Sequence, residues 1–281
     1  MKDFEGKTAV VTGAASGMGR AFAERFAAEG MKVVLADVEE AALETAVAQM
    51  SDAGHDVIGV QTDVSKLEAL HELAQRSVDA YGKVHIVCNN AGVDGYLGPI
   101  WEASPKDWQW TFGVNFWGVV HGVTAFMPIL LAQDEPAHIV NTASATAIVP
   151  GSNIYSVTKH AVLSYSEALY AQLSNAGAPV GVSALCPGTV NTKLFYGSRN
   201  RPDELRNPGE SMDHEPGDEA RAMLRGVLAR SIPPSDVADI LLDAIREERF
   251  YVLTDEEWDE TSRLRGEAIL ARGVPPQRQR R

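Results

Sequence analysis

Residues 8–19 read Thr-Ala-Val-Val-Thr-Gly-Ala-Ala-Ser-Gly-Met-Gly, a short apolar run that leads directly into a glycine-rich turn. The run predicts a strand over 8–12, and the pattern after the turn predicts a helix over 17–29. Glycines let the backbone turn sharply and approach a pyrophosphate, while the start of the helix offers free N–H groups and a positive dipole end. The candidate phosphate-binding residues are Gly13, Ser16, Gly17, Met18 and Gly19.

The glycines of this turn follow the spacing G-x-x-x-G-x-G, whereas the common dinucleotide fingerprint is G-x-G-x-x-G. The match is therefore to the mechanism of anion binding rather than to that string. Taken alone, such a turn is also explained by close packing of a helix against a strand, so its context has to decide between the two interpretations.

The rest of the chain alternates valine-rich runs with segments of helix length, the pattern of βαβ units around a parallel sheet. Further strands are expected at 32–37, 57–61, 84–88, 137–142, 180–186 and 250–253, and helices at 39–53, 65–81, 107–132, 155–175 and 235–247. Near-continuous apolar strands such as 33–36 suit a sheet covered by helices on both faces. The prediction is an α/β protein, a single-domain doubly wound Rossmann fold over residues 1–265.

The alternation stops after 180–186, and residues 197–218 are polar and rich in Pro, Gly, Asp, Glu and Arg. Long segments of this kind in compact domains are usually lids, binding loops or disordered stretches. We interpret about 193–230 as a substrate lid within the domain. The last residues, 266–281, are expected to form a flexible tail, and a solvated terminus explains their basic end better than a site for an anionic partner.

Composition narrows the classes of function. The chain has 281 residues, 45% hydrophobic and 22% charged, which is ordinary for a globular protein, and we identify no run of apolar residues that predicts a membrane span. A formal net charge of −13 argues against nucleic acid as a partner.

Neither the cysteines nor the histidines predict a special site. Cys88 and Cys186 each lie in an apolar run, and the seven histidines are scattered, so neither a disulfide nor a metal site is expected. The start of the chain lacks the apolar region of a secretory signal, which makes a cytoplasmic location the expectation.

Asp37 closes the second expected strand about 20 residues beyond the glycines, where a carboxylate accepts hydrogen bonds from the ribose hydroxyls of adenosine. The same charge would repel a 2′-phosphate, and the residues that follow, Val38, Glu39 and Glu40, offer no arginine to pair with one. NAD is therefore expected rather than NADP. Asp37 is alternatively the N-cap of the helix over 39–53, and the two roles are compatible.

Tyr155 and Lys159 are four residues apart in a segment expected to be helical, so both side chains lie on one face. A cation beside a tyrosine favours the phenolate and lowers its pKa from an ordinary value of about 10. Such a tyrosine can exchange a proton near neutral pH. The alternative is a core aromatic beside a solvated lysine, because this spacing is common on helices.

Several further motifs follow the turn in a fixed order. They are Asp63-Val64, Asn89-Asn90-Ala91-Gly92, Asn115, Tyr155-Ser156-Val157-Thr158-Lys159 and Pro187-Gly188-Thr189-Val190-Asn191-Thr192. In this order they resemble the short-chain dehydrogenases/reductases, over residues 5–192 and again near 235–253. The resemblance implies an NAD-dependent oxidoreductase that exchanges a hydride between a nicotinamide cofactor and a secondary alcohol or ketone. A catalytically silent cofactor-binding or assembly subunit and an epimerase or dehydratase are the alternatives.

The resemblance also implies which residues touch the cofactor. Asp63 and Val64 would border the adenine, and Asn89, Asn90, Ala91 and Gly92 would lie along the ribose side. Pro187 and Gly188 would turn the chain toward Val190 and Thr192, which would hold the nicotinamide carboxamide, although a tight turn alone also explains Pro187-Gly188. All follow expected strands, at the edge where open α/β sheets bind ligands.

Hydride transfer requires a group that exchanges the hydroxyl proton and a donor to the developing oxyanion. Tyr155 is the candidate acid/base, Lys159 the charge that tunes it, and Ser144 the candidate donor. Ser144 precedes Tyr155 by 11 residues, a shorter spacing than the family usually has, so Thr142, at 13 residues, is the alternative. The resemblance implies that Asn115 holds a water that links Lys159 to solvent, and the alternative is a satisfied buried amide.

Residues 93–101 are expected to form one wall of the substrate pocket and 194–196 another. These walls are largely apolar and aromatic, which favours a mid-sized apolar or cyclic secondary alcohol or ketone. The family's usual assembly pairs the helices corresponding to 107–132 and 155–175 between subunits, so the resemblance implies a homotetramer or homodimer. Apolar residues at 116–123 fit such an interface, and they equally fit contact with their own sheet. His121 and His160 are expected to be structural.

Overall fold

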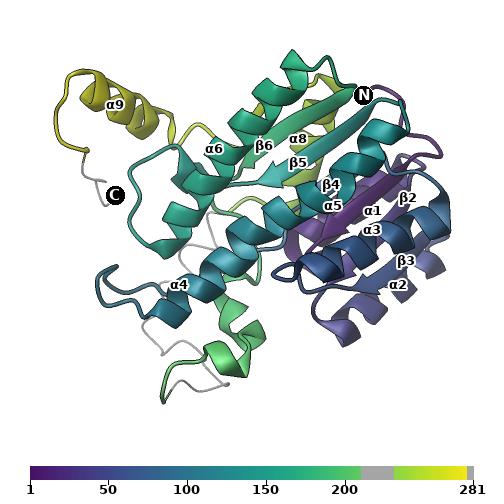
Figure 1. Ribbon diagram of the computed structural model, residues 1–281, viewed down its shortest axis with the longest axis horizontal. Coiled ribbons are helices and arrows are strands. Elements are labelled where there is room, and N and C mark those ends of the chain that lie inside the picture. The colour runs from purple at the N-terminus through teal and green to yellow at the C-terminus, as the bar shows by residue number, and fades with distance from the viewer. Residues whose placement is uncertain (210–230, 277–281) are drawn as a thin grey trace.

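Residues 1–209 and 231–276 are described by a computed structural model, whose centre is a seven-stranded parallel sheet (Figure 1). The strands are β1 (Thr8–Thr12), β2 (Lys32–Asp37), β3 (Val57–Gln61), β4 (Ile86–Asn89), β5 (Ala137–Thr142), β6 (Val180–Cys186) and β7 (Tyr251–Leu253). Their order across the sheet is β3-β2-β1-β4-β5-β6-β7. The doubly wound α/β fold predicted from the strand and helix pattern is therefore confirmed.

Helices cover both faces of the sheet because the strand side chains alternate between two apolar cores. The helices are α1 (Gly17–Ala28), α2 (Glu40–Asp52), α3 (Leu67–Tyr81), α4 (Pro105–Phe112), α5 (Gly118–Ala132), α6 (Ile154–Asn175), α8 (Pro234–Arg246) and α9 (Asp259–Leu270). Val33 and Leu35 pack in the core that holds α1, α2 and α8, whereas Val34 and Ala36 pack in the core that holds α3, α5 and α6. Both faces of β2 are thus removed from water, as its apolar sequence requires.

The centre of the sheet lies where β1 pairs with β2 on one side and with β4 on the other. From β1 the chain first winds outward through β2 and β3, and it then returns to build β4 to β7 on the opposite side. The crossover helices leave β1 and β4 in opposite directions, which opens a crevice at the carboxyl ends of these strands.

The long helix expected over 107–132 begins two residues earlier and contains an irregular turn. Ser104 accepts a hydrogen bond from the backbone of Asp107 and the Asp107 side chain accepts one from the backbone of Ser104, a capping box that fixes the helix start. Between α4 and α5 the residues Gly113–Trp117 form a π-helical turn, which contains Asn115. Such turns are rare and occur mostly at functional sites.

The whole segment Pro105–Ala132 is long and apolar enough to cross a membrane by length and composition, which the sequence prediction overlooked. In the structure it lies along one face of the sheet (Figure 1). Val119, Val123 and Phe126 are nearly inaccessible to solvent and pack in the cores beneath the helix. We therefore interpret it as a core helix, whose apolar residues cover the sheet.

The segment 266–281, predicted to be a flexible tail, begins within a helix, and its flexibility stays a prediction. Helix α9 continues to Leu270 and lies to one side of the sheet, at the upper left of Figure 1, with none of its residues buried. Trp258, just before the helix, is anchored in a small core with Ala145 and Val149. An apolar anchor ahead of the helix is the signal that the sequence analysis missed, and residues 277–281 lie outside the described part of the chain.

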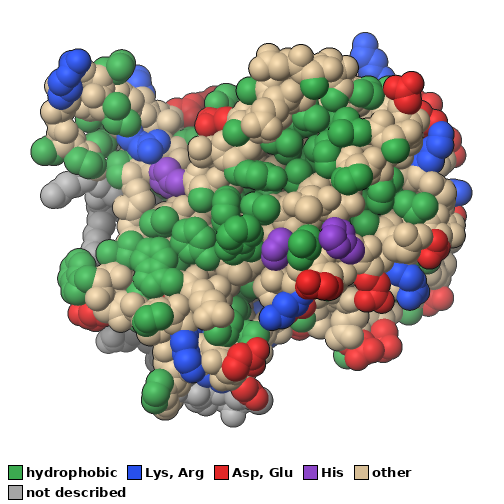
Figure 2. Space-filling view, in the orientation of Figure 1, with side chains coloured by type: hydrophobic (Ala, Val, Ile, Leu, Met, Phe, Trp, Pro, Cys, Tyr) green, Lys and Arg blue, Asp and Glu red, His purple; other side chains and the backbone are tan. Residues whose placement is uncertain are grey.

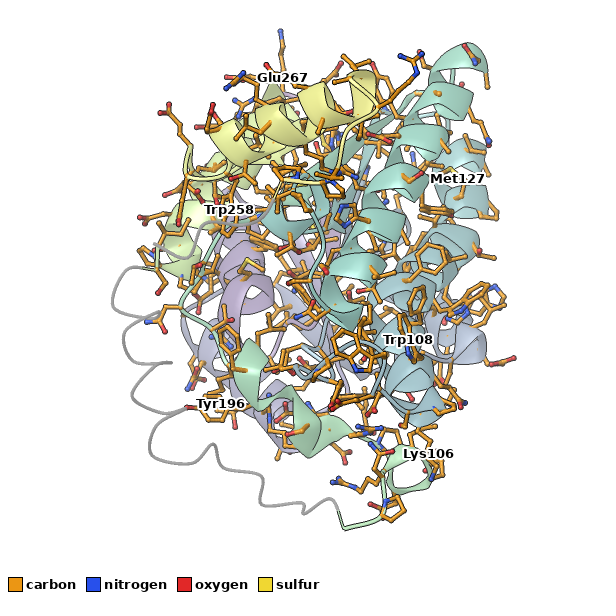
Figure 3. All side chains as sticks on the ribbon, turned by 90° about the vertical axis from the view of Figure 1, so that its left-hand side faces the viewer. Lys106, Trp108, Met127, Tyr196, Trp258 and Glu267 are labelled. Carbon is orange, nitrogen blue, oxygen red and sulfur yellow. The ribbon has the colours of Figure 1, made fainter. Side chains whose placement is uncertain are left out.

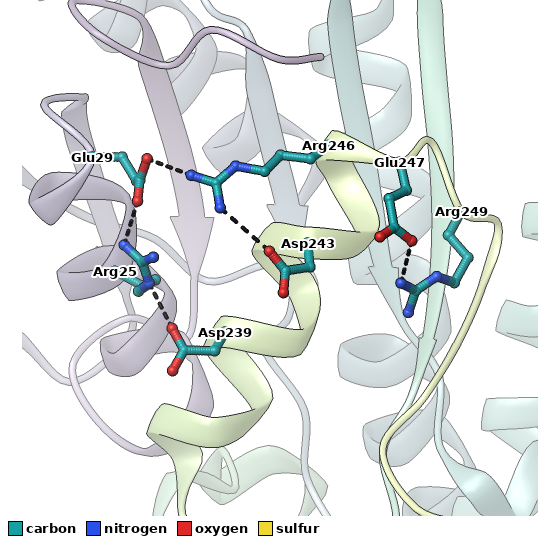
Figure 4. Close-up of polar contacts among 7 residues, drawn as sticks. All are labelled: Arg25, Glu29, Asp239, Asp243, Arg246, Glu247 and Arg249. Atoms are coloured by element: carbon teal, nitrogen blue, oxygen red, sulfur yellow. Dashed lines mark hydrogen bonds and ion pairs between the residues drawn. The ribbon is translucent and has the colours of Figure 1, made fainter.

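Charged side chains join α8 to α1 after the long excursion that precedes α8 (Figure 4). Arg25 contacts Glu29 at 2.7 Å and Asp239 at 2.6 Å, and Arg246 contacts Glu29 at 2.6 Å. The shared carboxylate of Glu29 makes this a network rather than isolated pairs, and networks contribute more than single surface pairs do. Burial of Glu29 works to raise its pKa, but the two arginines outweigh that effect and lower it.

We predict that Gly122→Ala destabilises the protein by about 1–3 kcal/mol through overpacking. A Cβ atom at Gly122 would lie 1.9 Å from the buried Asn89 Oδ1, and Asn89 is held by a 2.9 Å hydrogen bond to Asn141. Urea unfolding followed by circular dichroism measures the change. Gly266→Ala in α9 is the matched control, because a Cβ atom added there would meet nothing within 4 Å, and equal stability of the two variants would contradict the prediction.

Candidate active site

A cavity of about 470 Å³ opens at the carboxyl ends of the central strands, in the crevice between β1 and β4. It extends from Asp37 at the end of β2, past Gly13 and Asn90, to Tyr155 at the start of α6. The motifs that the sequence analysis selected, although far apart in the chain, thus meet around one space. A continuous cavity of this size is typical of sites for small molecules and cofactors.

The glycine-rich turn has a backbone that requires glycine. Gly13 and Gly17 have φ values of +67° and +56°, which side chains with a Cβ rarely adopt. A Cβ at Gly13 would lie 2.9 Å from the Ala91 Cα, and one at Gly19 would lie 2.1 Å from the Gly13 carbonyl oxygen. The turn therefore packs tightly on itself and on the end of β4.

The start of α1 also fits an anion. Ser16 is its N-cap, and the Ser16 side chain makes no capping hydrogen bond, so the first N–H groups of the helix stay available. Gly13, Ser16, Gly17 and Met18 all line the cavity. The residues present thus fit the pyrophosphate of a dinucleotide, as the sequence predicted from the mechanism of the turn.

Thr12 ties the turn to β4, a function that the sequence analysis missed. Its hydroxyl donates to the Cys88 carbonyl at 3.2 Å and accepts from the backbone N–H groups of Asn90 and Ala91 at 2.9 and 3.1 Å. The Asn90 amide in turn donates to the Thr12 carbonyl at 2.9 Å. These bonds place Asn90, Ala91 and Gly92 on the cavity wall.

Asp37 lies at the other end of the cavity, and the alternative that it caps α2 is wrong. The N-cap of α2 is Glu39. The Asp37 carboxylate instead accepts backbone hydrogen bonds from Ala15 at 2.9 Å and Glu39 at 3.0 Å, so it also supports the glycine-rich turn. Burial raises the pKa of Asp37, and the backbone N–H groups oppose that rise.

The remaining predicted cofactor residues divide into two groups. Asp63, Val64, Pro187 and Thr192 line the cavity. Gly19, Gly188 and Val190 do not line it among the described residues, and each is fixed behind the wall. Gly188 donates its backbone N–H to the Thr254 hydroxyl at 2.9 Å, and Val190 packs in the core beside α8.

Tyr155 stands in the first turn of α6, where the Asn153 capping box fixes the start of the helix. Burial raises the pKa of Tyr155 to about 12, and a hydrogen bond with Ser144 works against that rise. The expectation that Lys159 lowers this pKa below its ordinary value is therefore wrong for the protein by itself. The physical reason is that burial destabilises the phenolate by more free energy than the neighbouring groups stabilise it.

Lys159 lies on the same face of α6 as Tyr155, as its spacing predicted. Its ammonium is buried, donates to the Thr142 carbonyl at 2.8 Å and lies 5.6 Å from the centre of the Tyr155 ring. Burial lowers the pKa of Lys159 to about 8. The alternative of a solvated lysine is wrong, because a backbone carbonyl and an aromatic ring lie beside this charge in place of bulk water.

The two candidate hydroxyl donors have different surroundings. Ser144 lies near Tyr155 and works to lower the pKa of the phenol, and its side chain accepts from the Thr146 backbone N–H at 3.2 Å. The Thr142 hydroxyl donates to the side-chain Oδ1 of Asn90 at 3.4 Å, and the Thr142 backbone carbonyl accepts from Lys159. Ser144 does not itself line the cavity among the described residues, whereas Thr142 does, so the choice between them stays a prediction.

Asn115 lies in the π-helical turn and is fully buried. The side-chain oxygen of Asn115 accepts from the Val93 backbone N–H at 2.8 Å. The side-chain nitrogen donates to the Val93 backbone carbonyl at 2.8 Å and to the Thr158 hydroxyl at 3.1 Å. The alternative of a satisfied buried amide describes this side chain. The water that the resemblance assigns to Asn115 stays a prediction, while its side chain joins the segment after β4 to α6 beside Lys159.

The substrate walls are only partly those predicted. Of 93–101 only Val93 lines the cavity, and of 194–196 only Leu194 does so, as far as the structure is described. Aromatic side chains of α4 and the π-helical turn line the cavity instead; they are Trp110, Phe112 and Trp117. His121 and His160 each hydrogen-bond a backbone carbonyl, at 3.0 and 2.8 Å, as expected of structural histidines.

The first part of the expected lid is an ordered segment, residues 194–209, which we call the strap. It contains two short 3₁₀ helices, Leu194–Asn200 and Asp203–Leu205, and Figure 3 shows it running from Tyr196 toward Lys106 at the start of α4. Arg201 forms a buried ion pair with Asp107 at 2.7 Å, and Asn207 donates to the same carboxylate at 2.9 Å. Residues 210–230 of the expected lid lie outside the described part of the chain.

Comparison with known proteins agrees with this arrangement. The family model described as short chain dehydrogenase matches residues 7–203. A 1-deoxy-11-beta-hydroxypentalenate dehydrogenase of Streptomyces exfoliatus is 38% identical over 89% of this chain and 84% of its own length. A CLA biosynthesis dehydrogenase/reductase of Lactiplantibacillus plantarum is 31% identical over 98% of this chain and 97% of its own length.

A solved structure of a short chain dehydrogenase/reductase from Burkholderia phymatum, in complex with NAD, is 48% identical to this chain. It covers 99% of both chains with a TM-score of 0.92. The comparisons of sequence and of structure agree with each other and with the position of the cavity. The chain therefore belongs to the short chain dehydrogenase family of oxidoreductases that bind a nicotinamide cofactor.

Proposed function

We propose that this protein is an NAD-dependent oxidoreductase that transfers a hydride between the cofactor and a secondary alcohol or ketone. The observation that carries the proposal is the phenol of Tyr155, with the Lys159 ammonium beside its ring, at one end of a cavity whose other end holds Asp37 and the glycine-rich turn. The NAD in the similar Burkholderia phymatum structure supports the choice of cofactor.

The nicotinamide supplies the hydride acceptor or donor when it is bound, and the residues of this chain handle the proton. Tyr155 keeps its proton at neutral pH because burial raises its pKa to about 12, so it suits donation to a carbonyl oxygen. Ser144, which lies near the phenol, is the hydroxyl donor that we propose for the substrate oxygen. The buried charge of Lys159 favours the phenolate that forms when the proton leaves, since an opposite charge favours the ionised form.

The substrate that we propose is mid-sized and apolar or cyclic. Trp110, Phe112, Val114 and Trp117 line the cavity from one side and Leu194 and Leu205 from the strap. Apolar walls favour apolar ligands because they remove apolar surface from water. The hydroxypentalenate named for the Streptomyces relative is compatible with a hydroxyl-bearing substrate of this kind.

We propose that the protein assembles as a homotetramer or a homodimer. We also propose that it is located in the cytoplasm. Figure 2 shows hydrophobic side chains gathered over the face of α4, α5 and α6, where Trp117, Val157 and Tyr170 are exposed. Val119 and Val123 face their own sheet and do not contribute. Exposed aromatic residues on one face support pairing of subunits there.

Tyr155→Phe tests the proposed chemistry. We expect turnover of cyclic secondary alcohols with NAD to fall by about 10²- to 10⁴-fold, because the proton-exchanging group is lost. The dissociation constant for NADH, measured by fluorescence titration, should stay nearly unchanged. Wild-type protein that binds NADH but turns over no member of an alcohol and ketone panel would instead support a silent cofactor-binding subunit.

Asp37→Asn tests the choice of cofactor. Loss of the negative charge should weaken NADH binding and strengthen NADPH binding, and the ratio of the two dissociation constants should change by about tenfold or more, since hydrogen bonds to charged groups contribute about 1.5–3 kcal/mol. Glu40→Gln, an exposed neighbour on α2, controls for the change in net charge. An unchanged ratio in Asp37→Asn would contradict the assignment.

The pH dependence should differ between the two directions. Ketone reduction uses the protonated phenol, which the pKa of about 12 maintains, so its kcat/KM should stay level from about pH 6 to 8. Alcohol oxidation uses the phenolate, so its kcat/KM should rise with pH. Below about pH 8 the Lys159 ammonium keeps its charge, so Lys159→Met should lower kcat/KM for oxidation there, because the cation that favours the phenolate is lost. Equal values for the two proteins below about pH 8 would remove Lys159 from this role.

A further inference from the structure

One polar contact crosses the cavity from the cofactor side to the strap. Glu39 follows Asp37 at the end of β2, and its carboxylate accepts from the Arg199 guanidinium at 2.5 Å and from the Asn200 amide at 2.8 Å. Arg199 and Asn200 are 160 and 161 residues away in the sequence and belong to the strap. All three side chains line the cavity.

The strap is held firmly next to this contact. The ion pair of Arg201 with Asp107 is almost completely buried, with 4% and 2% of the two side chains exposed, and the Arg201 guanidinium lies 5.1 Å from the centre of the Trp110 ring. Arg199 is therefore only two residues from a fixed point on α4. The strap thus spans the cavity between a buried anchor at Asp107 and a second attachment at Glu39.

The charges at the second attachment favour its closed form. Burial of Glu39 works to raise its pKa, but the hydrogen bonds from Asn200 and Arg199 and the charge of Arg199 lower it, so the carboxylate is ionised at neutral pH. Glu39 also acts on Asp37, because the two negative charges repel each other. Arg199 offsets this repulsion, and the contact joins the strap to the residue beside the proposed adenosine site.

We propose that Glu39, Arg199 and Asn200 form a latch that holds the strap across the cavity and slows the release of a bound nicotinamide dinucleotide. The proposal rests on the proposed function and adds three cofactor-retaining residues to it. A ligand that fills the cavity from Asp37 to Tyr155 is bounded on one side by Glu39 and on the other by the strap. The latch has to open, while the anchor at Asp107 stays closed, before such a ligand leaves.

The partial exposure of the Arg199–Glu39 pair sets the size of the expected change in the NADH release rate. About one third of each of the Arg199 and Glu39 side chains is exposed, 35% and 32%, so water screens the pair in part. We therefore expect Glu39→Gln and Arg199→Gln each to raise the NADH dissociation rate about two- to fivefold. The double variant should be no faster than the faster single variant, because both changes remove the same contact.

Stopped-flow fluorescence, with NADH displaced from the full-length protein by excess NAD, measures this rate without any turnover. Glu40→Gln and Arg206→Gln are the matched controls, since Glu40 is exposed on α2 and Arg206 pairs with Asp203 within the strap rather than across the cavity. Raised salt should speed release from the wild type and from the controls but much less from the latch variants. Melting curves of all variants check that each is folded.

The outcomes separate the latch from the proposed function. If the wild type binds NADH and the latch variants release it at the wild-type rate, or if their effects simply multiply in the double variant, the latch is overturned and the proposed function stands. If the wild type binds neither NADH nor NADPH, the proposed function fails and the latch with it. Equal acceleration in the two controls also overturns the latch, because the effect would then come from net charge.

Discussion

The Thr12 hydroxyl joins the glycine-rich turn to the end of β4, and the rest of the site depends on this junction. β1 and β4 are paired neighbours at the centre of the sheet, and at their carboxyl ends the Thr12 hydroxyl donates to the Cys88 carbonyl and accepts from the backbone N–H groups of Asn90 and Ala91. Because this tie positions the glycine-rich turn against the end of β4, the cavity has a rigid floor. Gly13 shows how tight the fit is, since even a methyl group there would approach the Ala91 Cα to 2.9 Å. An anion-binding turn and a cofactor wall are thus parts of one hydrogen-bonded unit.

Burial acts on Tyr155 and Lys159 in opposite directions, and this sets the chemistry at the other end of the cavity. It raises the pKa of the phenol to about 12 and lowers that of the ammonium to about 8, so at neutral pH the phenol is neutral and the ammonium still carries its charge. The phenol therefore holds its proton more tightly than the lysine holds its own, although the two groups are nearly equal in water. Positive charge near the phenol controls how readily it gives up its proton. The Thr142 carbonyl, which accepts from Lys159, keeps that charge in place.

Much of the fold and the centre of the site were predictable from sequence because their signals are local. Apolar strands, the glycines at 13 and 17 and the spacing of Tyr155 and Lys159 each act within a few residues, and the motifs then meet because parallel strands end at one edge of the sheet. Four features were not predictable in this way. The π-helical turn around Asn115 leaves no mark in the apolar pattern of a long helix, and the anchored Trp258 and the latch at Glu39 depend on partners more than a hundred residues away. The raised pKa of Tyr155 likewise depends on burial, which spacing alone does not reveal.

The two ion pairs that attach the strap differ in their exposure to water, and this difference determines which of them separates first. The pair of Arg201 with Asp107 is removed from solvent, so separation of its partners would leave a buried charge without compensation, which costs about 3–5 kcal/mol. The pair of Arg199 with Glu39 is about one-third exposed, and water replaces each partner as they separate, which costs about 1 kcal/mol or less. A strap attached in this way opens first at Glu39 and pivots near residue 201. The cofactor end of the cavity therefore becomes accessible while the aromatic wall of α4, on which Arg201 rests, keeps the substrate end covered.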